Sequence, residues 1–353
     1  MSDCSQTRRE FLKTASAAAA AALAGPAPVE ARPADTRPAA GKILNFNPKM
    51  GYRRLGKTGI MISEISLGGH HGKSPEERRP VLERAAELGM NYVDNNIADE
   101  CAMYGKAMRG GLRDKWYIGF ASWPEKLTSE YEKEVSVDFF LRNIDARLKD
   151  YETDSLDMWR PVGATWGEGQ TDQKTMWEVN AGVLDMVVTA FEKAHKQGKV
   201  RFLGISAHKP SVFRRVLHDY PQFSVILFPY MFLTQPFGGD SLLELAKQKD
   251  VGVIAIKPFA AGATFAGGTP TKFEGRVDTR AASLLKAMLR ETRISAVIPG
   301  VGAIEQLDAN VKASYERDTP LSETDRRALR ECAENFHARL PSRYHWLHEW
   351  TTV

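Results

Sequence analysis

The sequence predicts a (β/α)8 barrel, and two observations predict it. Short apolar segments alternate with segments of helical spacing from residue 65 to residue 314, and polar residues follow the apolar segments where each one ends. The apolar segments are rich in β-branched and aromatic residues, as expected of parallel strands that are buried on both faces. Eight such strands, each followed by a helix, are typical of a (β/α)8 barrel.

The predicted elements follow one another in a regular order. Residues 52–62 predict a small N-terminal hairpin around a glycine-containing turn. The predicted strands cover residues 65–67, 92–94, 116–120, 156–159, 202–205, 224–228, 251–256 and 296–298. The predicted helices cover residues 75–88, 101–109, 135–149, 183–197, 211–218, 241–249, 279–290 and 304–314. The alternative fold, an open doubly wound sheet, requires a GxGxxG turn after its first strand, and residues 67–72 lack that spacing.

The N-terminal 31 residues resemble a twin-arginine export signal. Arg8 and Arg9 precede a Phe-Leu-Lys sequence and an alanine-rich run, with cleavage predicted after Ala24 or Ala31. Such a signal is recognised by the export machinery and is not an anchor. The alternative is an alanine-rich amphipathic helix or a disordered tail. We therefore expect a signal peptide over 1–31, a linker over 32–49, a barrel over 50–353 and a periplasmic or other extracytoplasmic location.

Composition limits the range of partners. The 353 residues carry a net charge of +4 with both signs interleaved, so no basic block indicates a nucleic-acid partner. The apolar run of the signal is shorter than the roughly 20 residues that span a bilayer, so we expect no stable membrane anchor. Cys101 and Cys332 lie far apart without metal-binding spacing, which predicts neither a disulfide framework nor a zinc site.

Polar residues at the predicted strand ends mark the expected site, because the reactive groups of a (β/α)8 barrel lie at the carboxyl ends of its strands. The first strand is followed by His70 and His71, and the second ends at Asp94. These three residues are the predicted catalytic group, with His70 and His71 as candidate acid-base residues. The same side chains together with His208 are an alternative divalent metal site, although we assign no metal ligand.

Several segments together resemble the aldo-keto reductase family. The matching segments are residues 52–59, 65–68, 89–94, 105–108, 198–206, 252–258, 297–300 and 305–310. The resemblance implies hydride transfer between NADP or NAD and a small carbonyl or sugar. It also implies an Asp, a Tyr, a Lys and a His around the substrate oxygen, with the Tyr as proton donor.

Only one of these four family residues is retained in this sequence. Asp94 matches the family Asp, whereas Asp99 occupies the position of the Tyr and Trp159 that of the His. The third strand ends in Ala-Ser where the family has its Lys. Tyr104 is a weaker candidate for the proton donor, because it occupies a position usually held by an aliphatic core residue.

The cofactor positions implied by the resemblance are better retained. Ser206 matches a residue that contacts the nicotinamide amide, and Lys257 is well placed for the pyrophosphate. Gly300, Gln306 and Asn310 match the adenosine-phosphate end. Residues 344–350 are aromatic enough to fold over the barrel mouth as a C-terminal tail.

Two functions are therefore compatible with the sequence. The first is an exported oxidoreductase of the aldo-keto reductase type that acts on a small carbonyl or sugar without the standard proton donor. The second is a barrel that binds a small molecule without hydride transfer, or catalyses a different reaction at the same mouth. The family resemblance favours the first function.

Overall fold

The computed structural model describes residues 43–69, 74–96, 98–122, 135–161, 182–235, 241–265 and 277–352. Eight parallel strands neighbour one another in the order in which they follow along the chain. In chain order the strands are β3 (Leu67–Gly68), β4 (Tyr92–Asn95), β5 (Tyr117–Ser122), β6 (Leu156–Pro161), β7 (Val200–Ser206), β8 (Phe223–Pro229), β9 (Gly252–Ile256) and β10 (Ala296–Ile298). A parallel bridge between Ile65 and Val297 joins the two edges, so the sheet closes and the predicted (β/α)8 barrel is confirmed.

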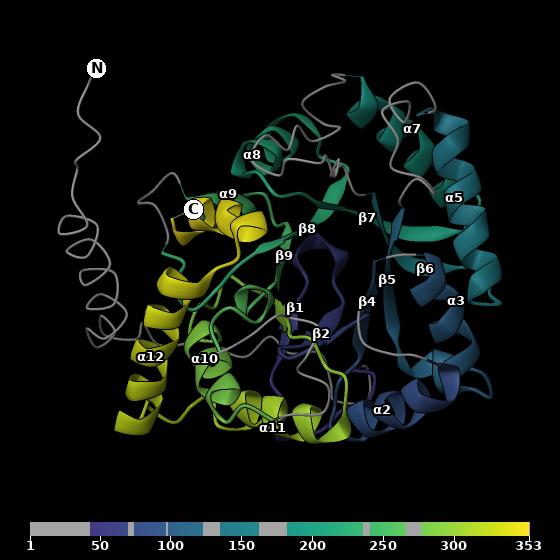
Figure 1. Cartoon of the computed structure of the whole chain (residues 1–353). Helices are drawn as coiled ribbons and strands as arrows, with labels where there is room; N and C mark the ends of the chain where they lie inside the picture. The colour runs from purple at the N-terminus through teal and green to yellow at the C-terminus, as the bar shows by residue number, and fades with distance from the viewer. Residues whose placement is uncertain are drawn as a thin grey trace, which may run out of the picture.

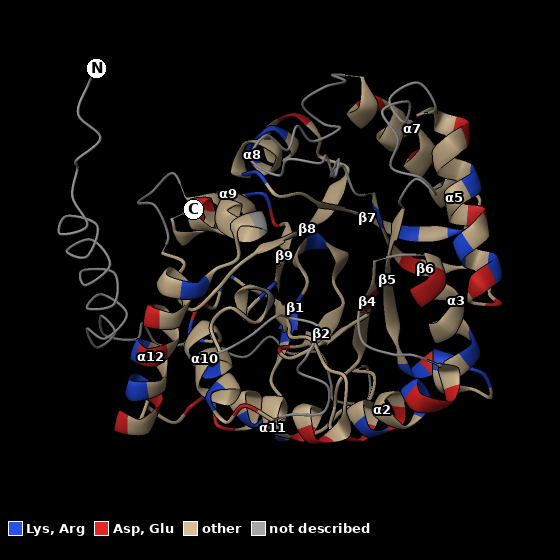
Figure 2. Ribbon diagram, in the orientation of Figure 1, with Lys and Arg blue, Asp and Glu red and all other residues tan. Residues whose placement is uncertain are grey.

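The helices between the strands form an outer ring around the barrel (Figure 1). They are α2 (Pro75–Glu87), α3 (Ala98–Ala107), α5 (Val137–Asp150), α7 (Val183–Lys196), α8 (Pro210–Asp219), α9 (Leu242–Gln248), α10 (Arg280–Met288) and α11 (Ile304–Tyr315). Several begin at serine caps, such as Ser74 and Ser136, whose side chains accept the backbone N–H of the third helical residue. Figure 2 shows both signs of charge interspersed along these outer helices.

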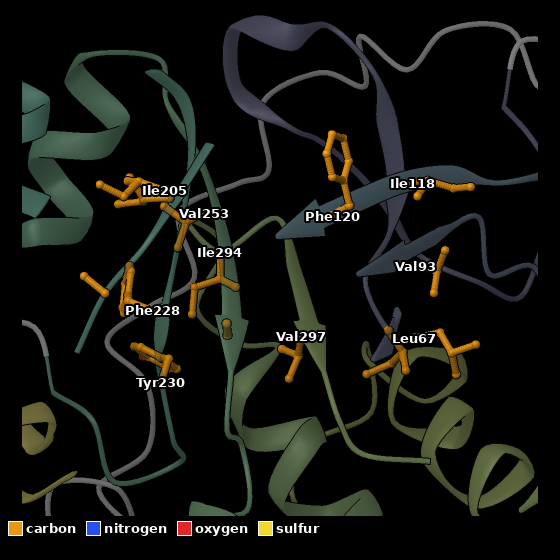
Figure 3. Packing of buried hydrophobic residues seen from close by; sticks show 14 of the residues in the cluster. Leu67, Val93, Ile118, Phe120, Ile205, Phe228, Tyr230, Val253, Ile294 and Val297 are labelled. Carbon is orange, nitrogen blue, oxygen red and sulfur yellow. The ribbon is translucent and has the colours of Figure 1, made fainter. Parts of the chain in front are cut away.

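Alternation along each strand separates two apolar layers. Tyr92, Met158 and Leu227 belong to the layer inside the barrel, whereas their chain neighbours Val93 and Trp159 belong to the layer between strands and helices. Figure 3 shows part of this outer layer, contributed by side chains of several strands. The five residues named above are completely buried. Because side chains alternate along a strand, only every second residue of each strand can reach the barrel mouth.

The predicted N-terminal hairpin is confirmed and fills the amino-terminal end of the barrel. Its strands are β1 (Tyr52–Arg54) and β2 (Met61–Ser63), joined through the short 3-10 helix η2 (Gly56–Thr58). Leu55, Ile60 and Ile62 project into the inner apolar layer. Gly56 has φ +48°, and a side chain there would collide with the backbone of residues 250–252. This end is therefore closed, and the opposite end remains for the site.

Two elements beyond the eight strand-helix pairs complete the fold. Helix α12 (Glu323–Arg339), which the sequence analysis did not predict, begins at a capping box formed by Ser322 and Asp325. A 3-10 segment, η7 (Ser342–Thr351), follows it and contains the predicted aromatic tail. Figure 1 shows α12 beside α10, with the C-terminus near α9.

Residues 43–49, which the sequence analysis assigned to the linker, pack against the barrel. The Asn45 side chain donates hydrogen bonds to the carbonyl oxygens of Met90 (2.6 Å) and Lys115 (2.8 Å), and Ile43 is buried. The predicted signal segment lies outside the described residues. None of the described helices is both long and apolar enough to cross a membrane.

Candidate active site at the barrel mouth

The centre of the candidate site is a buried ion pair between β4 and β6. The Arg160 Nη2 contacts one Asp94 carboxylate oxygen, and Arg160 Nε lies 3.3 Å from the other. The exposed fractions of the two side chains are only 4% and 6%. Arg160 Nη1 also lies 3.4 Å from the side-chain oxygen of Asn96, just beyond β4. Asp94 is thus held by a guanidinium in a two-point arrangement.

The strand between them makes room for this pair. Gly119 of β5 lies opposite Asp94 in the sheet register. A side chain on Gly119 would come within 2.1 Å of the Tyr92 hydroxyl and 2.5 Å of Asp94 Oδ2. The Tyr92 hydroxyl donates a 2.9 Å hydrogen bond to the same Asp94 oxygen. The Asp94 carboxylate is therefore held by the Tyr92 hydroxyl and by the Arg160 guanidinium.

Arg160 is the site residue that the sequence analysis missed. The family pattern placed Trp159 at the position of the catalytic His, but Trp159 points outward, packs against Phe140 and donates a 2.6 Å hydrogen bond to Ser122 Oγ. Arg160, one residue later, points inward. The alternation Met158-Trp159-Arg160 carried the signal, because a charged residue in a strand with both faces buried needs a partner.

Tyr104 is excluded as the proton donor by its location. Its ring is buried in the layer of helices, Arg78 lies over it, and its hydroxyl donates a 3.0 Å hydrogen bond to the carbonyl of Gly68. Burial raises the pKa of Tyr104 to about 12. A hydroxyl that is engaged in this way holds the end of β3 in place and does not face the mouth.

Lys257 follows β9 on the other side of the mouth. Its backbone has φ +56°, an uncommon conformation for a residue with a side chain. Burial, with repulsion from Arg160 as a smaller cause, lowers the pKa of Lys257 to about 8. The Lys257 side chain is only partly exposed, and burial is the larger of the two causes of its lowered pKa. Among the described residues, it has no ion-pair partner.

The C-terminal tail covers this side of the mouth, as predicted. Trp350 stacks on Phe228, and its Nε1 donates a 2.8 Å hydrogen bond to the His208 carbonyl. Trp346 stacks on the His208 ring at 4.0 Å, and Lys257 Nζ lies 5.8 Å from the Trp346 ring centroid. Burial, and to a smaller extent Lys257, lower the pKa of His208 to about 3. His208 is therefore neutral near pH 7 and does not compete with Lys257 for an anion.

The nicotinamide position fits a cofactor only in part. Ser206, at the end of β7, is 6% exposed and lies opposite Leu227 of β8 in the sheet register. Leu227 is completely buried in the barrel, where the family pattern leads us to expect a Gln. A serine hydroxyl can bind the carboxamide of a nicotinamide, whereas the leucine supplies no hydrogen bond.

The adenosine-phosphate end fits better. Gly300 and Gly302 precede α11, and Gln306 Oε1 accepts a 2.8 Å hydrogen bond from the Gly302 N–H. The N-cap of α11, Ala303, has no side-chain cap, so its first turn leaves backbone N–H groups for an anion. Asn310 lies on the same helix, 3% exposed. Gly300 and Gln306 therefore lie at this strand-to-helix junction, whereas Asn310 lies one turn further along α11, and the role of all three in cofactor binding stays a prediction.

His70 and His71 lie outside the described residues, so their role remains a prediction. The described residues contain no group of three or more His, Cys, Asp or Glu side chains that could hold a metal ion.

The fold and the position of Asp94 define the class of protein. The model of the aldo/keto reductase family matches residues 64–282. The chain therefore belongs to the aldo/keto reductase family.

Its relatives are distant. It is 24% identical over 319 residues to the "Uncharacterized oxidoreductase YqkF" of Bacillus subtilis, a match that covers 79% of this chain and 95% of that protein. It is also 24% identical over 321 residues to the L-glyceraldehyde 3-phosphate reductase of Escherichia coli O157:H7, covering 75% and 88%. Its fold resembles that of the aldo-keto reductase AKR11C1 from Bacillus halodurans in its holo form. The TM-score is 0.61 at 22% identity, with 80% of this chain and 96% of that one covered.

Proposed function

We propose that the chain is an exported oxidoreductase that transfers a hydride between NADP or NAD and a small carbonyl or sugar. One observation carries this proposal: Asp94, which the family resemblance assigns to the catalytic group, ends up at the carboxyl end of β4 in a buried ion pair with Arg160. Burying two charges is costly unless both are paired. An enclosed ion pair that projects into a barrel mouth supports a role in the reaction there.

The residues have two proposed roles: one supplies positive charge at the reacting oxygen, and the others hold the cofactor in position. A bound nicotinamide dinucleotide supplies the hydride. Arg160, oriented by Asp94, places fixed positive charge where negative charge develops on the substrate oxygen. Ser206 and the Gly300, Gln306 and Asn310 cluster hold the two ends of the cofactor. Because an arginine stays protonated, the proton must come from another group, and His70 and His71 are our candidates.

The alternative is a barrel that binds a small molecule without hydride transfer. It is favoured by Leu227, which is buried where a nicotinamide-binding Gln is expected, and by the absence of a tyrosine hydroxyl near Asp94 other than that of Tyr92 among the described residues. Burial and the Asp94 charge raise the pKa of Tyr92 well above its ordinary value, so Tyr92 is a poor acid.

Cofactor binding decides between the two. We expect the purified mature protein to bind NADPH or NADH in isothermal titration, and Gln306→Ala to weaken the binding. Nucleotide extracted from protein isolated from the export compartment gives an independent readout. If no nucleotide co-purifies and neither cofactor binds, the oxidoreductase function is wrong and the binding function stands.

The two histidines are tested separately. His70→Ala and His71→Ala are each expected to lower turnover by about 10²-fold or more if that residue donates the proton, while NADPH affinity stays unchanged. Unchanged turnover in both single variants on any identified substrate would eliminate them as proton donors.

Export is tested on the intact precursor. Replacing both Arg8 and Arg9 by Lys keeps the charge and removes the twin-arginine pair. We expect the variant to stay in the cytoplasm as uncleaved precursor, with the native protein recovered from the extracytoplasmic fraction as control. Equal fractionation of the two would contradict the twin-arginine route.

A further inference from the structure

Two hydrogen-bond donors at the covered side of the mouth have no acceptor among the described residues. One is Lys257 Nζ, which makes no ion pair with any described residue, and the causes of its lowered pKa are burial and Arg160. The other is Trp346 Nε1, which is buried without a hydrogen-bond partner. Lys257 Nζ lies 5.8 Å from the centroid of the Trp346 ring, so both donors belong to one small region.

Leaving such groups unpaired costs free energy. A buried donor without an acceptor destabilises the folded state, and a charged donor does so more strongly. Lys257 is also held in the left-handed backbone region, which adds a further cost in free energy. Local costs of this kind are common where a ligand completes the site, because the ligand then supplies the missing acceptors.

The surroundings indicate the charge of that ligand. Arg160, which is close enough to lower the Lys257 pKa, adds positive potential from β6. Asp94 is fully engaged by Arg160 and Tyr92 and does not neutralise Lys257. His208 is neutral and covers one face of Trp346. A lysine and an indole N–H offer hydrogen bonds suited to the two oxygens of one carboxylate.

We propose that Lys257 Nζ and Trp346 Nε1 form an anion subsite that binds the carboxylate of the substrate, which would make the substrate a sugar acid or a related carbonyl acid. That the bound anion is the substrate rests on the proposed function, whereas the anion subsite itself does not depend on that function. The sequence analysis assigned Lys257 to the cofactor pyrophosphate. Its contact with Trp346 of the C-terminal tail favours a role at the substrate mouth over the role at the pyrophosphate that the family resemblance implies.

The first test uses gluconate and sorbitol as probes, because they share a polyol chain and differ by the carboxylate. In isothermal titration of the mature protein we expect gluconate to bind and sorbitol not to bind. Lys257→Met is expected to weaken gluconate binding by about tenfold or more, and Trp346→Phe by about two- to tenfold. Lys199→Met, which removes a half-buried lysine that pairs with Asp145, should change nothing.

Lysine protonation gives the second readout. Gluconate stays ionised from pH 6 to pH 10, whereas Lys257 loses its proton near pH 8. His208 is already neutral in that range, arginine side chains stay protonated, and Asp94 is paired with Arg160. Affinity should therefore fall as pH rises through about 8 in the native protein. Lys257→Arg should keep the affinity at pH 7 within a few fold and lose this pH dependence, because arginine stays protonated.

Three results would overturn the subsite: equal binding of sorbitol and gluconate, unchanged gluconate affinity in Lys257→Met, or displacement of gluconate by NADPH. The last result would return Lys257 to the cofactor pyrophosphate. If NADPH fails to bind while gluconate binds through Lys257, the proposed oxidoreductase function fails and the anion subsite survives.

Discussion

The two sides of the barrel mouth differ in whether their buried charged and polar groups have partners. On the side of β4 to β6, Asp94 and Arg160 satisfy each other, and Trp159 donates to Ser122. On the side of β9 and the C-terminal tail, neither Lys257 Nζ nor Trp346 Nε1 has an acceptor among the described residues. On the first side the charged pair and the Trp159 indole have partners as folded, whereas on the second side we propose that a ligand supplies the acceptors. A cation and an indole N–H are therefore paired on one side and lack an acceptor among the described residues on the other.

Removing the paired cation is the strongest test of this difference. Arg160→Met leaves the Asp94 carboxylate buried without its cation, with only the Tyr92 hydroxyl as a partner, which should lower the free energy of unfolding by about 3–5 kcal/mol. Urea denaturation measures the loss. Arg54→Met, at an ion pair with Asp250 whose side chains are 54% and 47% exposed, is the control and should cost less than about 1 kcal/mol.

A double variant identifies the cause of that loss. Asp94→Asn together with Arg160→Met removes both charges, so it should be less destabilised than the sum of the two single variants. A strictly additive result would mean that the ion pair is not coupled, and the contrast between the two sides would then be wrong.

Removing the unpaired cation should have the opposite sign. Lys257 has its pKa lowered from 10.5 to about 8 in the folded protein. The charged lysine therefore destabilises the fold at pH 7, by about 3 kcal/mol at most. Lys257→Met should raise the free energy of unfolding at pH 7 by up to that amount, measured by urea denaturation without ligand.

The pH dependence of the Lys257 effect fixes its origin. Below pH 8 the lysine is protonated in both states, and the full destabilisation is present. Between pH 8 and 10.5 the unfolded state binds more protons than the folded state, so native stability rises with pH relative to Lys257→Met. The difference between the two proteins should therefore shrink across this range. A difference that is constant with pH would show that the lysine acts through packing.

The barrel could be predicted from the sequence because its signals are local. Strands buried on both faces require apolar runs, and helices between them require caps and helical spacing, so elements such as α2 and β8 appear at the predicted places. Helix α12 was not predicted because its sequence is strongly charged, with few of its side chains buried. It stays in place through tertiary contacts with α10, which no local pattern reveals.

The site could be predicted only in part, because partners come from separate strands. Asp94 was expected at a strand end, but its ion pair with Arg160 joins residues 66 positions apart. The family motif also placed the expected inward-pointing residue of β6 at Trp159, one position before Arg160, which is the residue that points inward. In a strand, a shift of one residue moves a side chain to the opposite face, so Arg160 was overlooked although its charge in a buried strand was visible.

The two indole groups allow a smaller comparison. Trp159→Phe keeps most of the buried ring, which packs edge-on against Phe140, but it removes the donor and leaves the buried Ser122 hydroxyl without its partner. We expect a loss of about 1–3 kcal/mol in the free energy of unfolding. Ser122→Ala, which leaves the Trp159 indole N–H without its acceptor, should lower the free energy of unfolding by a similar amount. A neutral result for both would show that this side is held by packing alone.

Trp346→Phe, the matching change on the tail side, should have the smallest effect. The smaller ring loses some buried area and keeps its stacking on His208, while the unpaired buried N–H disappears. These two contributions oppose each other, so the free energy of unfolding should change by less than about 1 kcal/mol in either direction. Saturating gluconate should reverse this balance, because in the native protein the indole N–H then has an acceptor. Ligand should therefore stabilise the native protein more than Trp346→Phe, and equal stabilisation would show that Trp346 contributes no hydrogen bond to the subsite.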